Sequence, residues 1–514
     1  MQADLSRVTF DAAKHFSAVL SQQGRVQLDA DFNEQAAILL HQLRTTVADL
    51  IGAAGAPAGA AGFAITPVPD PDADKAVTDL EVGPGRMYVD GILAENDNAL
   101  RYWKQPDGYL EPDADGDRLP QKVPYVVYLR VWERLVTALQ DPAIREVALG
   151  DSGPDTAARA RVVWQVARQD FPNVTFETAP GELKKWLDGL NPHRGLLTAR
   201  ALRPRDVEEK PCDLSPEARF RGPENQLYRV EVHTGGPAWR ESNTKGTFLS
   251  GATFKWSREN ASVVFPVLSV SDQDIKLATL GRDGKLALEV GDWVELVDDA
   301  TAARVADDVP LTGLVRSAPP LRRVIAIDAA DRLITVDSPF GTDDCGPGTR
   351  ADRHPMLRRW DHTSPANYGT RKTEVVSDGA LPLIEGDWID LEDGVQVMFT
   401  APPKPPGAAD TDAVSRGTYR RGDYWQIPAR TITGDVEWPD NPDGSPAARL
   451  PHGVDYHYVP LAFIDAAGAA KDLRPKFTAG ATPVWPPAAV LAPEPAATPP
   501  ATSSRSKSRP ASRE

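Results

Sequence analysis

Turn-forming residues interrupt this chain at short intervals, and this limits the length of its helices and strands. The 514 residues include 47 prolines and 39 glycines. Proline fixes φ and lacks a backbone donor, and glycine adopts turn conformations readily, so both end regular elements. Hydrophobic residues make up 41% of the chain, which is enough for folded cores. We therefore expect a mainly β protein with several small β-sandwich or β-barrel modules, preceded by an N-terminal helical module.

One long amphipathic helix is predicted near the N-terminus, beginning near Asp29. Apolar residues recur there at steps of three and four residues, namely Phe32, Ala36, Leu39, Leu40, Leu43, Val47 and Leu50. Asp31 and Glu34 have the spacing of a capping box, and Gly52 is a typical helix stop. Residues 10–26 also favour a partly helical segment.

These N-terminal apolar residues allow two interpretations. Their side chains either pack against their own domain or form an interface with another protein chain. In the second interpretation, residues 1–52 are a helical docking module that binds a partner or self-associates. The candidate interface residues are then Phe16, Phe32, Leu39 and Leu43.

The rest of the chain divides by composition into further parts. Residues 51–69 carry no charge and consist mostly of Ala, Gly and Pro, which is typical of a flexible linker. Residues 125–132 form the clearest strand, because they are rich in β-branched and aromatic residues. The predicted parts are a flexible linker (53–76), a β-rich domain (77–240), a β-rich domain with small-barrel units (241–400), a C-terminal β segment (401–477) and a disordered Pro/Ala/Ser tail (478–514).

The charge balance argues against nucleic-acid binding. Asp and Glu number 73 against 57 Lys and Arg, giving a formal net charge of −16 at pH 7, whereas a nucleic-acid binder needs a basic face. The N-terminus lacks the basic region and apolar run of a secretory signal. No run of about 20 strongly apolar residues predicts a membrane span. We expect a protein made in the cytoplasm, with no nucleic-acid partner and no membrane span.

No catalytic or cofactor motif stands out in the sequence. The chain has no Gly-x-Ser-x-Gly elbow, no Gly-rich phosphate loop ending in Gly-Lys, and no Gly-x-Gly-x-x-Gly entering a helix. The two cysteines, Cys212 and Cys345, form at most one disulfide, and two reduced thiols are the preferred interpretation. We predict that the protein is not an enzyme and binds no cofactor.

Three polar clusters have the composition of metal sites but not the spacing. Residues 354–362 and 452–457 each contain two histidines and an aspartate, in segments beside prolines, without the spacing of helical zinc ligands. Residues 113–117 are rich in Asp, as a calcium loop is, but Pro124 stands where that loop needs a glutamate. We predict no metal site.

Aromatic residues are the remaining functional signal. The chain has 12 tryptophans, several of them beside polar residues. Exposed aromatic rings stack on sugars or act as interface hot spots. The candidate surface-recognition aromatics are Trp388, Tyr424 and Trp425. The alternative is that each of them anchors a small β core.

Several long phrases of the sequence point to a family when they are taken together. They lie at residues 4–10, 22–34, 85–91, 131–134, 145–150, 224–231, 254–260 and 419–430. They resemble an uncharacterised bacterial family that is catalogued as a domain of unknown function. The resemblance covers residues 1 to about 475, with Phe32 where a tryptophan is expected for the family.

This resemblance has implications for function. It implies an association with phage-tail-like contractile injection systems, in which some relatives carry the N-terminal module ahead of β-helical, spike-like regions. No catalytic residue is established for the family, so none is implied here. The resemblance therefore predicts a structural or accessory component of such a particle, at its baseplate, fibre or spike. Its partners would be other particle subunits or further copies of the same chain.

Two alternative functions stay open at this point. The first is a carbohydrate-binding or carbohydrate-cleaving β protein that recognises a cell-surface glycan through its aromatic residues. The second is a payload carried inside a particle, with an activity that no sequence motif reveals.

Overall fold

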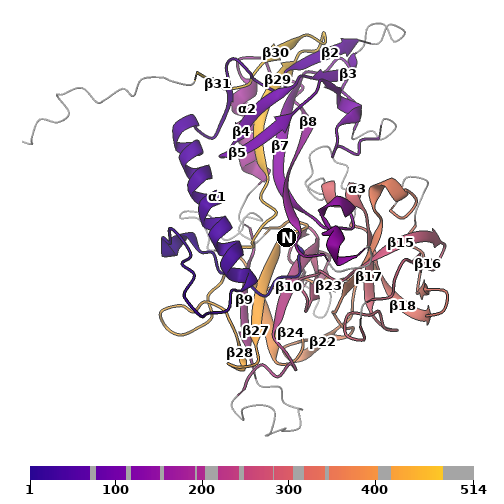
Figure 1. The fold of residues 1–514 in the computed structure, drawn as a ribbon. Coiled ribbons are helices and arrows are strands. Elements are labelled where there is room, and N and C mark those ends of the chain that lie inside the picture. The colour runs from indigo at the N-terminus through magenta and orange to yellow at the C-terminus, as the bar shows by residue number, and fades with distance from the viewer. Residues whose placement is uncertain are drawn as a thin grey trace, which may run out of the picture. The chain divides into compact units, whose positions relative to one another are not determined.

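The structure, a computed structural model, describes most of the chain. The described residues are 1–69, 77–111, 117–150, 155–190, 194–202, 218–241, 248–281, 283–304, 318–341, 347–402 and 418–478. Cys212 and Cys345 lie outside these ranges, as does the predicted tail beyond residue 478. The described part is mainly β, as the sequence predicts, with an N-terminal helix, several sheets and a closed barrel (Figure 1).

Helix α1 (Asp29–Ile51) confirms the predicted N-terminal helix. It ends at Gly52, whose φ of 92° is readily reached by glycine alone. At its start, the Asp31 carboxylate accepts a hydrogen bond from the Leu28 amide at 3.2 Å, so Asp31 caps the helix from inside its first turn. Glu34, the expected partner of Asp31, instead accepts a hydrogen bond from the Thr9 hydroxyl at 2.6 Å.

The predicted helical character of residues 10–26 is wrong. That range contains a single 3-10 turn, Ala12–Lys14. The segment runs beside α1: the Phe10 and His41 ring centroids are 5.6 Å apart, and the Val19 amide donates to the Gln35 side chain at 2.7 Å. Because side chains of α1 supply these partners, the segment can remain extended without its own helical hydrogen bonds.

Three sheets, built from the first 170 residues together with the last strands of the described chain, share one hydrophobic core that includes Val82, Met87, Leu129 and Leu461. The first contains β31 (Lys476–Phe477), β1 (Ala54–Pro57), β4 (Gly85–Val89) and β5 (Ile92–Asn96). The second contains β2 (Ile65–Pro69), β3 (Val77–Val82) and β6 (Leu100–Arg101). The third contains β30 (Ala470–Asp472), β29 (His457–Ile464), β7 (Tyr125–Val136) and β8 (Arg159–Asp170). Strands β7 and β29 are long because their β-branched and aromatic residues suit a pleated, buried surface.

Helix α2 (Ala179–Leu190) packs on β7 and β29 through a separate cluster of apolar side chains. Leu183 and Trp186 contact this cluster, and the ring centroids of Trp186 and Tyr128 are 5.4 Å apart. Alternate residues of β7 therefore serve two cores, one on each face of the strand.

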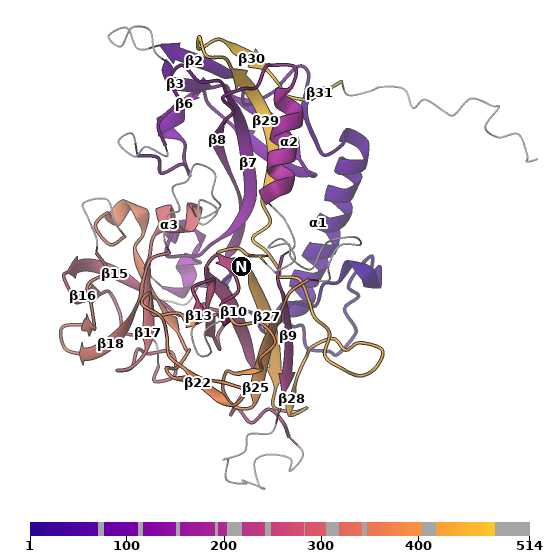
Figure 2. The ribbon, with the colours of Figure 1, turned by 180° about the vertical axis from the view of Figure 1, so that it is seen from behind.

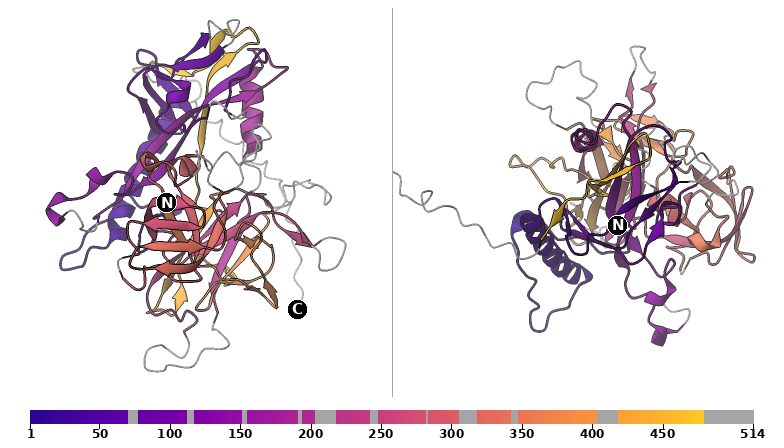
Figure 3. Two further views of the ribbon diagram at one scale, coloured as in Figure 1. Left: turned by 90° about the vertical axis from the view of Figure 1, so that its right-hand side faces the viewer. Right: turned by 90° about the horizontal axis from the view of Figure 1, so that it is seen from above.

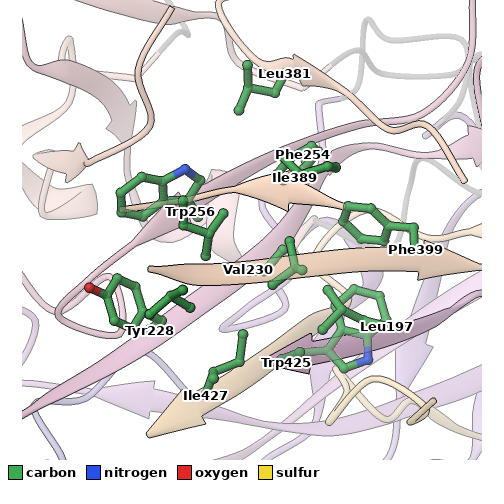
Figure 4. Close-up of a cluster of buried hydrophobic side chains, with 14 of the residues drawn as sticks. Leu197, Tyr228, Val230, Phe254, Trp256, Leu381, Ile389, Phe399, Trp425 and Ile427 are labelled. Atoms are coloured by element: carbon green, nitrogen blue, oxygen red, sulfur yellow. The ribbon is translucent and has the colours of Figure 1, made fainter. Parts of the chain in front are cut away.

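A sandwich of two sheets follows, and Figure 4 shows the side chains packed between them. One sheet contains β23 (Leu381–Pro382), β14 (Thr253–Ser257), β10 (Gln226–Thr234), β27 (Tyr424–Arg430) and β28 (Asp435–Val436). The other contains β22 (Arg371–Thr373), β21 (Ala366–Tyr368), β24 (Ile389–Asp390), β25 (Val395–Thr400) and β9 (Leu196–Ala201). Two short ladders accompany them: β11 (Gly236–Pro237) with β26 (Thr418–Tyr419), and β12 (Arg240–Glu241) with β13 (Phe248–Leu249).

A closed barrel confirms the small barrel expected within residues 241–400. Its strands, in order around the barrel, are β15 (Val264–Ser271), β16 (Asp274–Leu277), β19 (Leu333–Val336), β18 (Leu321–Asp328), β17 (Trp293–Val297) and β20 (Met356–Trp360). Phe265, Ile275 and Leu357 are among the buried side chains of its core. The short helix α3 (Asp299–Ala303) follows β17 (Figure 2).

Strand pairing joins parts of the chain that lie far apart in the sequence. Strand β1 pairs with β31, β7 with β29, β9 with β25, and β10 with β27. These pairs cross the boundaries predicted at residues 240 and 400, and residues 1–477 form one compact unit. The predicted flexible linker, 53–76, contains β1 and β2 in its described part, so that prediction is wrong. Its Ala and Gly residues suit close contact between strands: a Cβ on Gly62 would lie 2.3 Å from the Gly85 carbonyl carbon.

The described residues contain no helix that is long and apolar enough to cross a membrane. Helix α1 has 23 residues, but it carries Asp29, Asp31, Glu34, Arg44 and Asp49.

Candidate functional site

Exposed apolar side chains are concentrated in the N-terminal segment. Half of the large apolar side chains that stay exposed in the described part of the chain lie between residues 8 and 50. We call this set the N-terminal apolar surface, and it consists of Val8, Phe16, Leu20, Val26, Leu28, Phe32, Leu39, Leu40, Leu43 and Leu50. The exposed fractions run from 42% for Leu40 to 83% for Val26. Burial of such side chains is favourable, so this concentration of exposed ones makes the segment a candidate contact surface.

Helix α1 is fixed to the body of the protein by its opposite side. Ala30 and Ile38 are 1% exposed, and Arg44 forms an ion pair with Glu133 of β7 at 2.8 Å. Gly91, between β4 and β5, lies directly against α1, because a Cβ there would lie 2.3 Å from the Arg44 carbonyl oxygen. These contacts orient the helix, and Figure 3 shows α1 on the outside of the unit.

All four candidate interface residues are exposed in the structure. Phe16 is 56% exposed, Phe32 68%, Leu39 56% and Leu43 60%. These four residues belong to the N-terminal apolar surface, half of which lies on an extended segment and half on the helix. The first interpretation, in which these side chains pack on their own domain, does not describe the structure.

The three candidate recognition aromatics are covered to different degrees. Trp425 is fully buried between the two sheets of the sandwich, and its indole N–H donates to the Arg449 carbonyl at 2.9 Å (Figure 4). Its predicted exposure is wrong, because side chains alternate along β27 and Trp425 occupies the face that points into the core. Trp388 is half-buried, with the Arg200 guanidinium carbon 3.7 Å from its ring centroid.

Tyr424 lies on the other face of β27, beside a cavity of about 360 Å³. The guanidinium carbon of Arg229 lies 3.5 Å from the Tyr424 ring centroid and covers that face of the ring. The cavity is lined by charged residues from several strands, among them Arg229, Glu231, Lys255, Glu295 and Arg358. We call these five residues the central ionic cluster.

The central ionic cluster is largely paired within itself. The Arg229 Nε lies 2.6 Å from Glu231, and the Lys255 ammonium lies 2.6 Å from Glu295. Burial opposes the ionisation of Glu231, but Arg229 and Lys255 outweigh it and hold the pKa of Glu231 below its usual value. Burial also opposes the ionisation of Glu295, but the Lys255 ammonium outweighs this effect and lowers the pKa of Glu295. These carboxylates are therefore held ionised, as partners for buried cations.

The first residues of the chain occupy one side of this cavity. The Met1 carbonyl accepts hydrogen bonds from Arg229 at 3.4 Å and from the Asn260 side chain at 3.1 Å. The Asn260 side chain also donates to the Ala3 carbonyl at 2.7 Å, and the Gln2 side chain donates to Glu231 at 3.2 Å. The Met1 amine donates to the Tyr424 hydroxyl. The cavity thus holds a main-chain segment of the protein itself.

Sequence reasoning missed the central ionic cluster. Arg229, Glu231 and Lys255 belong to strands whose pattern gives no metal or catalytic motif. The available signal was that each of these charged residues stands between two apolar or aromatic neighbours in the sequence of its strand. Such charges are buried only when opposite charges lie beside them, and Lys255 finds its partners Glu231 and Glu295 on other strands.

The histidines of the rejected metal clusters have separate partners. His354 lies 2.7 Å from Asp299, and His457 lies 2.8 Å from Asp90. The His362 ring stacks on Trp293 and its Nε2 lies 2.9 Å from the Gly379 carbonyl, while burial lowers its pKa to about 4. Among the described residues, no three potential metal ligands come together. Residues 112–116, which hold most of the predicted acidic loop, lie outside the described residues.

Comparison with known proteins identifies the family. Residues 1–191 and 177–511 match the family of unknown function DUF6519. The chain belongs to this family. The two matches together span nearly the whole of this DUF6519 protein, including α1, the sandwich and the barrel. No curated protein and no solved structure matches it.

Proposed function

We propose that this DUF6519 protein is a structural or accessory subunit of a larger protein assembly and that it is not an enzyme. The N-terminal apolar surface is its contact with a neighbouring subunit. The observation that carries this proposal is the concentration of exposed apolar side chains on α1 and on the segment before it. Monomeric proteins rarely leave more than about 300–600 Å² of contiguous apolar surface exposed, because its burial is favourable.

The way α1 is held supports the same function. An apolar helix face that served only the fold would point toward the body of the protein. Here Arg44 and Ile38 fix the helix from the inner side, and Phe32, Leu39 and Leu43 stay exposed. The fold therefore presents this face outward on a rigid element, as a preformed docking surface does.

The assembly we propose is a phage-tail-like contractile particle. This assignment rests on the resemblance of the sequence phrases at residues 4–10, 22–34 and 419–430 to a family associated with such particles. In this setting the chain is made in the cytoplasm and incorporated with other subunits, at the baseplate, fibre or spike. It contacts these subunits through protein surfaces and has no nucleic-acid partner.

The structure offers less support for glycan recognition by the three candidate aromatics. Trp425 is buried, and arginine side chains lie over the rings of Trp388 and Tyr424. A sugar-binding platform needs an accessible ring face. No observation favours the payload alternative over the subunit.

Purified particles from a strain that carries the gene test the proposal. The full chain should co-purify with them. A Phe16→Ser/Leu20→Ser variant should be lost from the particles, because it removes apolar contact area without touching a core. Leu268→Ser is the matched control, since Leu268 is 58% exposed on barrel strand β15. Absence of the wild-type chain from particles, or full incorporation of the double variant, would contradict the proposal.

A further inference from the structure

The exposed face of α1 has the repeat of a coiled coil. Residues at alternating steps of four and three form a stripe along the helix, which we call the α1 seam: Phe32, Ala36, Leu39, Leu43, Thr46 and Leu50. All six residues are exposed, with Leu50 at 81%. The Thr46 hydroxyl donates to the Gln42 carbonyl at 2.8 Å, so the polar group of Thr46 is satisfied within its own helix. The seam therefore presents only apolar groups to a partner.

This spacing fits another helix better than it fits a sheet or a loop. A repeat of 3.5 residues keeps one stripe facing a second helix along the whole contact, with knobs packing into holes. The other helices in the described residues do not cover the seam. Helix α2 packs on β7 and β29, and Ala303 of α3 packs near Trp132. A helix of another chain would complete this contact.

The seam is complementary to itself when two copies run antiparallel. The spacing of the seam residues is symmetric about position 41. In an antiparallel pair, the first seam residue of one helix therefore faces the sixth of the other, the second faces the fifth, and the third faces the fourth. The facing pairs are Phe32 with Leu50, Ala36 with Thr46, and Leu39 with Leu43. Large side chains thus meet large ones and small meet small, which gives layers of matched volume.

Charge also favours the antiparallel arrangement. Asp29, Asp31 and Glu34 lie in the first two turns of α1. A parallel pair would bring the acidic ends of both helices together, whereas an antiparallel pair separates them by about 27 Å, the length of 18 helical residues. The seam also lacks the β-branched residues at alternate positions that favour parallel dimers, since Ala36, Leu43 and Leu50 stand there.

We propose that two copies of this chain form a two-fold symmetric dimer in which their α1 seams pack antiparallel. This inference rests on the proposed function, because it takes the N-terminal apolar surface as a surface of assembly and names the partner of its helical part. The extended part, with Phe16, Leu20 and Val26, remains available to other subunits.

Sedimentation equilibrium of the purified full chain is the first test. The measured mass should be twice the 55.7 kDa of the chain. Leu43→Glu should raise the dissociation constant on the order of 100-fold or more, because each substitution places two charges in the symmetric interface. Leu268→Glu, on the exposed face of the barrel, should leave the dissociation constant unchanged. A monomer at all concentrations, or a dimer that is insensitive to Leu43→Glu, would overturn the proposal.

Disulfide cross-linking tests the direction of the helices. In a Cys212→Ser/Cys345→Ser background, Phe32→Cys and Leu50→Cys chains should cross-link when mixed and not when each is oxidised alone. Cross-linking of each variant with itself would show a parallel pair and overturn the inference. These outcomes are separate from the particle experiment: a monomeric chain that still enters particles through Phe16 and Leu20 contradicts the dimer alone. A dimer that is absent from particles contradicts the proposed function alone.

Discussion

Glu392 shows how burial in this fold sets the behaviour of a single residue. It follows β24 and accepts a hydrogen bond from the Tyr228 hydroxyl at 3.1 Å, and it pairs with Arg258 at 2.7 Å. Burial raises the pKa of Glu392 to about 7, and the attraction of Arg258 only partly offsets this effect. The folded protein therefore binds a proton at Glu392 more tightly than the unfolded chain does.

The pH dependence of stability follows from this difference. Between about pH 4.5 and pH 7 the folded state holds more protons at Glu392 than the unfolded state, so this residue lowers the free energy of unfolding as the pH rises. Glu392→Gln should remove this contribution, which is at most about 3 kcal/mol across the window. Urea unfolding at several pH values measures it, with Glu182→Gln as the control for loss of a carboxylate, since the Glu182 side chain on helix α2 is 46% exposed. Parallel pH profiles for the wild type and Glu392→Gln would disprove the assignment.

Two tryptophans of the sandwich provide a second prediction at this scale. Trp425→Ala should lower the free energy of unfolding by about 3–5 kcal/mol, because it leaves a large cavity in a closed core. Trp388→Ala should cost clearly less, since that side chain is already half-exposed beneath Arg200. Chemical denaturation of both variants gives the comparison. Equal losses would mean that Trp425 is not the core anchor that the structure indicates.

The sequence could not distinguish these tryptophans. Trp425 and Trp388 both lie at the start of a strand and close to an acidic residue. Whether each ring points into the core depends on which strands and sheets lie next to it in the fold. The sequence could not predict the central ionic cluster for the same reason. Glu295 and Lys255 lie 40 residues apart, and only the folded barrel and sandwich bring them into contact. By contrast, local helical spacing places Phe32, Leu39 and Leu43 on one face of a helix, which the sequence shows directly, whereas the exposure of that face is known only from the structure.

At the scale of elements, local patterns predicted α1 and the barrel but not the strands near residue 60. The spacing of apolar residues in α1 repeats within the helix and needs no distant partner. Strands β1 and β2 are poor in large apolar residues, and β1 becomes a strand because it pairs with β4 on one side and β31 on the other. One of these partners, β31, lies more than 400 residues away in the sequence, so local patterns around residue 60 do not reveal this pairing.

The attachment of α1 to the body can be tested at one glycine. Gly91 has a φ of 79° and its Cα lies against the Arg44 main chain, so Gly91→Ala should push α1 away from the hairpin of β4 and β5. Hydrogen exchange in α1 should become faster in this variant. Gly386→Ala is the matched control, because Gly386 has a φ of 85° with open space around it. This control carries the same cost of placing a Cβ at positive φ, about 1–2 kcal/mol, but it should leave hydrogen exchange in α1 unchanged.

At the scale of the whole molecule, pairing between distant strands joins residues 1–477 into one compact unit, within which the closed barrel keeps all of its strands in one continuous stretch of chain. The predicted domain 77–240 contains β7 but lacks β29, its neighbour in the sheet. That fragment should therefore not fold alone. Residues 261–362 contain every strand of the closed barrel and should fold alone, with cooperative thermal unfolding measured by circular dichroism. A cooperatively folded 77–240 fragment would contradict this description of the unit.

In the function that we propose, the N-terminal apolar surface joins this unit to a neighbouring subunit, because the β body carries an outward-facing helix and an extended segment that both expose apolar side chains. Arg229 of the central ionic cluster binds the Met1 carbonyl, and Asn260 binds the Ala3 carbonyl. These hydrogen bonds hold the start of the extended segment against the β body. Hydroxyl-radical footprinting of the full chain in its assembled state, compared with the Leu43→Glu variant, tests this role most directly. We expect strong protection of Leu39, Leu43 and Leu50 in the wild type, with Leu268 labelled equally in both samples. Equal labelling of α1 in the two samples would show that this surface is not a site of assembly.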